Sequence, residues 1–308
     1  MSQCTDTVMM VRPARFGFNP EVPDNAFAAR STLAPTEISR RAVAAFDAMV
    51  DALRAHGVRV VVVQDTPEPE TPDAVFPNNW ISLHPDGRVV LWPMFAPSRR
   101  AERRLDVLDR LRAEGFGIGE VLDWTHHERE GRVCEGTGSL VLDHEQRVAY
   151  ACRSQRTDAG LVDAFCAAFG LQPVLFDAFS GPTGARVPCY HTNVVMAVGE
   201  GAALWCPDAI DDVEQRRAVG ERLAAPGRDV VMITEAQLGA FAGNALQLAG
   251  RDGPVWVLSR RAHDSLDPAQ RQRLAATGRL LPVDLDLIET IGGGSARCML
   301  AEVFSPRR

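Results

Sequence analysis

The sequence contains no apolar run that approaches the roughly 18 consecutive residues needed to cross a bilayer. The early apolar stretch Val8–Val11 is too short for a secretory signal, and no basic segment precedes it. Acidic residues outnumber basic ones, 40 to 33, and the densest basic cluster, at 99–104, is interrupted by Glu102. We therefore expect neither a membrane nor a nucleic acid as a partner.

Paired-cysteine motifs are also missing. The sequence has no Cys-x-x-Cys, and its spacing fits neither a disulfide framework nor a zinc knuckle. We expect a reduced, cytoplasmic protein in which most cysteines are small buried apolar groups. Cys189-x-His191 could ligate a metal, but no second pair accompanies it, so we expect no metal or other cofactor. The seven cysteines stand at positions 4, 134, 152, 166, 189, 206 and 298.

Nucleotide-binding motifs are lacking as well. Gly115, Gly117 and Gly119 follow a predicted helix and precede a predicted strand, which reverses the order that a dinucleotide-binding fingerprint requires. No phosphate-loop motif occurs. These absences, together with the tight hairpins described next, argue against a doubly wound parallel sheet.

What the 308 residues do contain is a repeated pattern. Alternating apolar runs joined by short polar turns predict four hairpins, at 80–92, 139–152, 194–206 and 245–258. An amphipathic helix is predicted after each hairpin, at about 100–114, 158–169, 212–225 and 268–277. A short apolar strand is predicted after each helix, near 117–122, 172–176, 229–233 and 280–285. With 46% hydrophobic and 24% charged residues, the composition is that of an ordinary globular protein.

A fifth copy of this unit is split between the two ends of the sequence. One end supplies a strand at Val8–Val11, a helix near 38–56 and a strand at Val58–Val63, and the other supplies the strand Cys298–Phe304. Joining them would close a ring and remove exposed sheet edges, which predicts an α/β fold of the propeller class. The predicted domain covers 1–308, with its fifth unit divided between 1–64 and 297–308.

One polar or reactive position stands at or just before the start of each hairpin, and at the start of the last strand. These positions recur 53 to 57 residues apart: Asn78 with Asn79, Glu135, His191, Asn244 and Cys298. Equivalent positions in a closed ring converge on its axis, so we expect these side chains to meet in one central cleft. Taken singly, each has an ordinary interpretation, such as a buried cysteine, a capping glutamate or a turn-forming asparagine. Because all of these positions recur at nearly the same interval, we favour one shared functional site over these separate interpretations.

A cysteine, a histidine and a carboxylate in one cleft suggest covalent catalysis. The thiolate is the attacking species, and a protonated histidine beside it would help the thiol to ionise. The histidine can then protonate a leaving amine and later activate water, while the carboxylate fixes its tautomer.

These residues and their flanking motifs resemble the amidinotransferase/dihydrolase (pentein) superfamily, which includes arginine deiminases and dimethylarginine dimethylaminohydrolases. The resemblance covers nearly the whole chain, is nearest to the arginine-deiminase-related citrulline-utilisation hydrolases, and implies a five-bladed α/β propeller. It implies that Cys298 in Gly-Gly-Gly-Ser-Ala-Arg-Cys is the nucleophile. It likewise implies that His191 in Tyr-His-Thr-Asn is the general acid and base, and that Glu135 in Glu-Gly-Thr-Gly-Ser-Leu is its partner.

Two arginines match the family's substrate-carboxylate positions. Arg99, in Ala-Pro-Ser-Arg-Arg, resembles the first, and Arg156, in Ser-Gln-Arg-Thr, resembles the second. Arginine suits bidentate recognition of a carboxylate, so the resemblance implies an α-amino-acid substrate. The alternative is that both arginines are solvated at the starts of helices.

Three asparagines depart from the guanidine-handling relatives. Those relatives carry acids where this chain has Asn79 and often Asn78, and arginine deiminases carry one where it has Asn193. A buried guanidinium needs carboxylate partners, whereas amides suit a neutral ureido group. We therefore expect a hydrolase that prefers citrulline, releasing ornithine, over arginine.

Other functions remain open. The enzyme alternatives are an amidinotransferase and an arginine- or dimethylarginine-deiminase type of hydrolase, and the non-enzyme alternative is a ring protein such as the ribosome anti-association factors. The expected partner is a small amino-acid substrate, and a homo-oligomer is possible. The segment Phe16–Leu33 is either a loop over the cleft or an ordinary surface loop.

Overall fold

The computed structural model describes residues 2–22, 25, 27–181 and 186–307. Within these residues, five sheets have three strands and one has two. Each three-stranded sheet combines an antiparallel pair with a parallel pair, as a hairpin–helix–strand unit requires. The predicted α/β propeller with five units is confirmed.

The four continuous units follow one another along the chain. The first contains η1 (Pro77–Asn79), β3 (Ile81–Leu83), β4 (Val89–Leu91), α2 (Pro97–Arg100), α3 (Asp106–Ala113), β5 (Val121–Asp123) and η2 (Thr125–Glu130). The second contains α4 (Gly136–Ser139), β6 (Val141–Asp143), β7 (Val148–Cys152), α5 (Ala159–Phe169) and β8 (Gln172–Phe176), followed by β9 (Phe179–Ser180) and β10 (Val187–Pro188). The third contains η3 (Thr192–Val194), β11 (Met196–Val198), β12 (Ala202–Trp205), η4 (Pro207–Ala209), α6 (Val213–Ala224) and β13 (Asp229–Met232). The fourth contains α7 (Glu235–Gly239), β14 (Leu246–Gly250), β15 (Gly253–Ser259), α8 (Arg260–Ser265), α9 (Pro268–Ala275) and β16 (Arg279–Val283).

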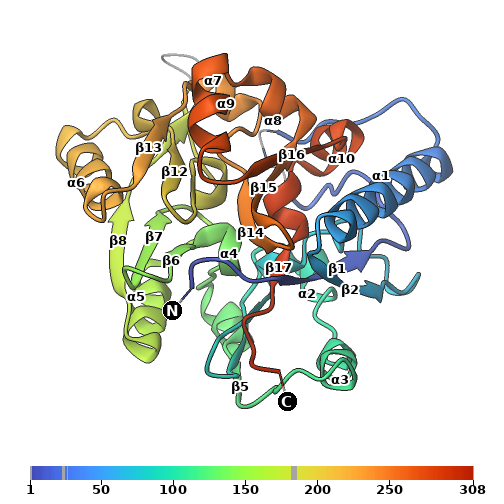
Figure 1. Cartoon of the computed structure of the whole chain (residues 1–308). Helices are drawn as coiled ribbons and strands as arrows, with labels where there is room; N and C mark the ends of the chain where they lie inside the picture. The colour runs from blue at the N-terminus through green and yellow to red at the C-terminus, as the bar shows by residue number, and fades with distance from the viewer. Residues whose placement is uncertain (1, 23–24, 26, 182–185, 308) are drawn as a thin grey trace.

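The split unit draws on both ends of the chain. It contains β1 (Thr7–Arg12), α1 (Pro35–Ala55) and β2 (Arg59–Gln64) from one end, and α10 (Asp286–Gly292), η5 (Ala296–Met299) and β17 (Ala301–Glu302) from the other. Strand β1 pairs in parallel with β2 and antiparallel with β17, through Val8 opposite Glu302 and Met9 opposite Ala301. Figure 1 shows the blue β1 beside the red β17. The predicted closure of the ring is confirmed.

Three predicted boundaries are wrong. The last strand is only β17, and Cys298 lies before it in the 3-10 turn η5. The helix predicted at 100–114 is divided into α2 and α3, and the residues between them include Glu102, which is buried and pairs with the buried Arg99 instead of facing solvent as on an outer helix. The strand predicted near 117–122 is shifted to β5.

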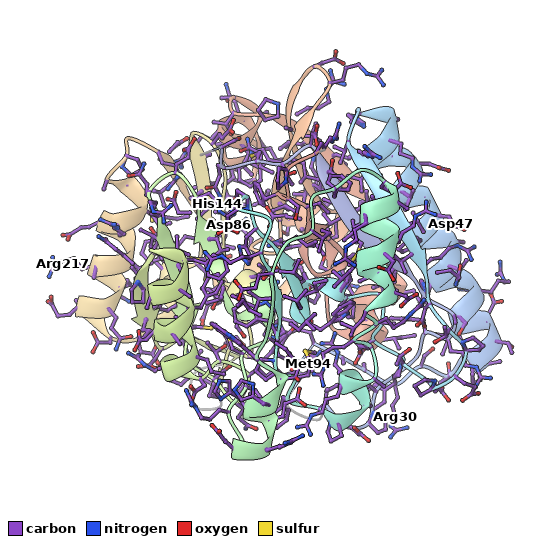
Figure 2. All side chains as sticks on the ribbon, turned by 90° about the horizontal axis from the view of Figure 1, so that it is seen from below. Arg30, Asp47, Asp86, Met94, His144 and Arg217 are labelled. Carbon is purple, nitrogen blue, oxygen red and sulfur yellow. The ribbon has the colours of Figure 1, made fainter. Side chains whose placement is uncertain are left out.

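Apolar side chains at helical spacing explain how the outer helices attach. Helix α1 buries one face against the sheets: Ile38, Ala42, Phe46, Met49, Val50 and Leu53. Each large apolar side chain buried in this way contributes about 1.5–3 kcal/mol. Asp47 on α1 and Arg217 on α6 point outward on opposite sides of the molecule (Figure 2). No described helix is long and apolar enough to cross a bilayer.

Glycines allow the units to approach closely around the axis. Gly136 has a φ of 47°, and a side chain there would place its Cβ 2.3 Å from the carbonyl oxygen of Asn78 in the neighbouring unit. A Cβ on Gly243 would likewise lie 2.3 Å from the carbonyl oxygen of Val194. The inner turns therefore touch backbone to backbone, which only glycine permits.

A buried ion pair joins the second and third units, and its loss should destabilise the fold. Arg228 donates to Asp143 over 2.8 Å, and the two side chains are 2% and 0% exposed. We expect Arg228→Ala to cost about 3–5 kcal/mol in the free energy of unfolding, because Asp143 keeps a buried, unpaired charge. Chemical denaturation measures this. The double variant Asp143→Asn/Arg228→Met should lose less, and an equal loss would contradict the account.

Candidate active site

Short helical turns carry the predicted site residues to the axis. Asn78 and Asn79 lie in η1, Glu135 and His191 immediately precede α4 and η3, and Cys298 lies in η5. Turn η1 contacts both α4 and η5, and α4 contacts η3. The units thus bring together residues that are far apart in sequence, as the common phase predicts.

The motif Glu-Gly-Thr-Gly-Ser explains how Glu135 is held. The Ser139 hydroxyl accepts from the backbone N–H of Glu135 over 2.9 Å and donates to the carbonyl of Arg156 over 2.7 Å. A Cβ on Gly138 would lie 2.9 Å from Nδ1 of His191 and 2.4 Å from Nδ2 of Asn79. The small residues of this motif therefore leave room for the histidine and the amide.

His191 and Glu135 form a buried hydrogen-bonded pair. The imidazole Nε2 lies 2.8 Å from Oε2 of Glu135, and the two residues are 2% and 0% exposed. Glu135 also accepts from the backbone N–H of Phe95 through Oε1, over 3.0 Å. With Nε2–H donated to the carboxylate, Nδ1 of a neutral imidazole is free to accept a proton.

Burial controls the charge of this pair. It lowers the pKa of His191 below its ordinary value, and the hydrogen bond to Glu135 offsets only part of that effect. Burial would raise the pKa of Glu135, but Arg156 and the hydrogen bond from His191 lower it well below its usual range. At neutral pH the pair is therefore a neutral imidazole beside a carboxylate, so a protonated His191 arises only once it has taken a proton.

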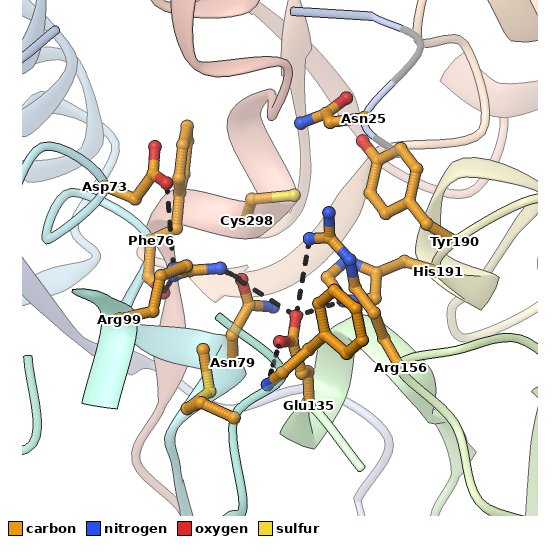
Figure 3. Close-up of polar contacts among 12 residues, drawn as sticks. Asn25, Asp73, Phe76, Asn79, Arg99, Glu135, Arg156, Tyr190, His191 and Cys298 are labelled. Carbon is orange, nitrogen blue, oxygen red and sulfur yellow. Dashed lines mark hydrogen bonds and ion pairs between the residues drawn. The ribbon is translucent and has the colours of Figure 1, made fainter. Parts of the chain in front are cut away.

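Amide groups surround the sulfur of Cys298. The residue is 3% exposed, and its Sγ lies 3.3 Å from Nδ2 of Asn244 and 3.6 Å from Nδ2 of Asn193. Cys298 and His191 line the same pocket, together with Asn79 (Figure 3). The thiol of Cys298 and the imidazole of His191 therefore face one small space, with Glu135 behind the imidazole as its hydrogen-bond partner.

The two predicted arginines are both buried, so the alternative that they are solvated is wrong. Arg99 is 3% exposed, donates through Nε and Nη2 to Glu102, and donates through Nη1 to Oδ1 of Asn79 over 2.8 Å. Arg156 is 2% exposed, lies 3.6 Å from Glu135 and packs over the ring of Tyr190. Figure 3 shows the two arginines on either side of Glu135.

A family model matches most of the chain. Residues 12–305 match the model described as N,N dimethylarginine dimethylhydrolase, eukaryotic. The chain belongs to this family. It is therefore a hydrolase of guanidino carbon–nitrogen bonds. A solved structure of similar fold, a variant of the N-terminal domain of ArgZ, is covalently bonded to a reaction intermediate.

Solved structures share the family fold. The N-terminal domain of ArgZ, a cyanobacterial arginine dihydrolase, is 18% identical with a TM-score of 0.72, over 97% of this chain and 98% of that one. Against the longer ArgZ chain the TM-score is 0.74 at 18% identity, over 98% of this chain and 41% of that one. A dimethylarginine dimethylaminohydrolase is 17% identical with a TM-score of 0.65, over 96% of this chain and 98% of that one. No curated protein sequence matches this chain.

The pocket lined by Cys298 and His191 also contains a carboxylate that the sequence pattern did not reveal. Asp73 is 3% exposed and lines the pocket, with Oδ2 accepting from Asn19 over 2.8 Å. Its Oδ1 is buried and makes no hydrogen bond to the described residues. Burial raises the pKa of Asp73, and Arg99 offsets part of the rise. In the sequence, Asp73 could have been singled out because it is an acid directly before the apolar run Ala74–Phe76.

The described part of the segment Phe16–Leu33 reaches the pocket. Val22 and Asn25 line it, and Nδ2 of Asn25 donates to the carbonyl of Gly292 over 3.1 Å. Tyr190 lines the pocket next to this segment, with its ring centroid 5.9 Å from that of Phe27, and donates its hydroxyl to the carbonyl of Gly293 over 2.5 Å. Of the two interpretations of this segment, the contacts of Val22 and Asn25 favour a loop over the cleft.

Metal ligands do not gather here. Among the described residues, no group of three or more His, Cys, Asp or Glu side chains could hold a metal ion. Cys189 is 1% exposed and its thiol lies in an apolar cluster. The cysteine of Cys189-x-His191 is therefore a core residue in this structure.

Proposed function

We propose that this chain uses Cys298 as a covalent nucleophile to hydrolyse a ureido amino acid, with citrulline preferred over arginine and ornithine as the product. The observation that carries the proposal is the amide lining beside the pair of His191 and Glu135. Asn79 lines the pocket, and its Nδ2 makes no hydrogen bond to the described residues. Asn78 is 0% exposed, and neither of its side-chain polar atoms makes a hydrogen bond to the described residues, but it is not among the described residues that line the pocket.

Buried amides without partners are costly unless a ligand satisfies them. A ureido group offers a carbonyl that accepts and N–H groups that donate, and it carries no charge to compensate. The carboxylate beside the base, Glu135, already accepts a hydrogen bond from His191 and lies 3.6 Å from Arg156 and 3.9 Å from Arg99. A guanidinium bound beside His191 would therefore lie near Arg99 and Arg156, which already interact with the one carboxylate there.

The α-amino-acid end of the substrate finds opposite charges in the same pocket. Arg156 suits the α-carboxylate, and the unpartnered Oδ1 of Asp73 suits the α-ammonium. Arg99 donates hydrogen bonds to Glu102 and Asn79. In this proposal it therefore holds the Asn79 amide in place and adds positive charge near the α-carboxylate of the substrate. Relatives of this fold have been solved with substrate or with L-arginine bound, which supports a substrate of this size.

The reaction proceeds in two displacements. His191 takes the thiol proton at Nδ1, and the Cys298 sulfur bonds to the ureido carbon. The tetrahedral adduct collapses as His191 returns a proton to the departing NH₂ group, which leaves as ammonia. The Cys298 sulfur is then bonded, as a thiocarbamate, to the carbonyl carbon on the side-chain nitrogen of ornithine. Water, deprotonated by His191, then attacks that carbon and expels the thiolate. The released carbamate loses carbon dioxide to give ornithine.

Arginine is the second candidate substrate, because the family match is to guanidino hydrolases. An amidinotransferase would use the same residues but pass the group to an amine. Adding glycine as an acceptor separates the two: a transferase makes a guanidino product from it, whereas a hydrolase releases the same ammonia with or without it.

A substrate panel tests the preference. We expect kcat/KM for citrulline to exceed that for arginine at least tenfold, with agmatine slow because it lacks the α-carboxylate that Arg156 would bind. Asn79→Asp keeps the acceptor for Arg99 and adds a negative charge, so it should shift the citrulline-to-arginine ratio about tenfold or more toward arginine.

Asn79→Ser is the matched control, because it removes the amide without adding charge. It should slow citrulline turnover and lower the citrulline-to-arginine ratio less than Asn79→Asp does, because it adds no charge that attracts a guanidinium. Faster turnover of arginine than of citrulline by the wild-type enzyme would overturn the proposed preference, while leaving the cysteine mechanism intact.

A further inference from the structure

We propose that Asn244 is an additional catalytic residue, which together with Asn193 donates hydrogen bonds to the Cys298 thiolate. This inference rests on the proposed role of Cys298 as the nucleophile. It assigns a chemical task to the fourth unit, whose inner turn contributes no acid, base or arginine to the pocket.

The orientation of the Asn244 amide is fixed by the backbone. Its Oδ1 accepts from the N–H of Arg297 over 3.0 Å, and its Nδ2 donates to the carbonyl of Asn193 over 3.0 Å. A flipped amide would set its NH₂ against an N–H and its oxygen against a carbonyl. The second N–H of Nδ2 is therefore left for the sulfur of Cys298, 3.3 Å away.

Asn193 supplies a longer second donor. Its Nδ2 lies 3.6 Å from the same sulfur and 3.3 Å from the carbonyl of Thr137. Both asparagines are essentially buried, at 0% and 1% exposed, so these donors act where water screens little. The sulfur thus lies between two amide donors that come from different units of the ring.

A buried thiolate needs such donors because its other neighbour is uncharged. Burial keeps His191 neutral at rest, so no imidazolium is present to stabilise the sulfur anion before the proton moves. Cys298 itself is 3% exposed, and a buried anion is costly without hydrogen bonds. Asn244 and Asn193 can provide these bonds without introducing a positive charge next to a neutral substrate.

The same donors serve both displacements. In the first, the sulfur gives its electron pair to the ureido carbon after its proton has gone to His191. In the second, the carbon–sulfur bond breaks and its electron pair returns to the sulfur. Donors that stabilise the thiolate therefore favour its formation at the start and its departure at the end.

Alkylation of Cys298 as a function of pH tests this role. Iodoacetamide is uncharged, so its approach does not depend on the charge of a variant, and mass spectrometry assigns the modified cysteine. Asn244→Asp keeps the acceptor for the Arg297 N–H but replaces the donor with an acceptor. We expect its alkylation rate at neutral pH to fall about tenfold or more, with the pH midpoint moved upward. Asn193→Ser should give a smaller shift in the same direction, because it removes the longer contact.

A residue that acted only on structure would lower the rate by one factor at every pH and leave the midpoint in place. A midpoint equal to the wild-type value in both variants would overturn the role of Asn244 while leaving the nucleophile assignment standing. If Asn244→Asp does not fold, Asn193→Ser alone decides, with an unshifted midpoint counting against the proposal. Turnover by Cys298→Ser at the wild-type rate would instead remove the proposed function itself.

Discussion

Cys298→Ala is expected to abolish citrulline hydrolysis, with a loss on the order of 10⁵-fold or more in kcat, because no other described side chain in the pocket can form the covalent intermediate. Ammonia release measures the loss. The wild-type enzyme quenched during turnover should carry the mass of citrulline less ammonia, as a thiocarbamate, on the peptide that contains Cys298, and the variant should carry none.

Cys166→Ala is the matched control for this result. Cys166 is also buried, at 2% exposed, but it packs among apolar side chains around α5, away from the pocket. We expect this variant to keep its turnover apart from a modest loss of stability from the smaller side chain. Wild-type turnover by Cys298→Ala would reject the mechanism.

Glu135→Gln should lower kcat/KM by about 10³-fold, because it reverses the polarity of the group that orients His191. The glutamine NH₂ can donate to Nε2, which would place the imidazole proton on Nδ1 and remove the acceptor for the thiol proton. Loss of the negative charge also removes the interaction that partly raises the pKa of His191, so that pKa falls further. Since the base works only when neutral, the acid limb of the residual activity should move to lower pH.

The pH dependence of kcat/KM measures both effects. In the wild-type enzyme the acid limb should already lie below the ordinary histidine pKa of about 6.5. Glu128→Gln is the control, because Glu128 is also largely buried and pairs with Arg103 and Arg100 outside the pocket. If the acid limb of Glu135→Gln lay at the same pH as in the wild-type enzyme, Glu135 would not influence the pKa of His191, and this account would be wrong.

The repeat made much of this architecture predictable. Each unit uses the same local pattern of hairpin, helix and strand, and the helix that starts after Asp267 begins where its capping residue and Pro268 indicate. The residues at the axis could be found because they hold equivalent positions in successive units. Glu135 and His191 meet at 2.8 Å although 56 residues separate them in sequence.

The details that the sequence did not predict depend on contacts between units. The turn that holds Cys298 resembles the start of a strand in its apolar pattern, but Asn244 fixes the preceding N–H and holds it in a 3-10 conformation. Asp73 lies outside the repeated phase, so periodicity could not reveal it. The internal pairing of Arg99 with Glu102 and Asn79 is likewise a tertiary feature.

The contacts of Gly136 and Gly243 constrain how such an enzyme can change. With backbone atoms of adjoining units already touching, any larger residue in those turns would force the units apart and separate the sulfur from the imidazole. Single substitutions at these two glycines therefore cannot widen the pocket gradually. New specificity has to come from swapping functional groups of similar size, such as amide for carboxylate, or from remodelling the segment around Val22 and Asn25 at its entrance.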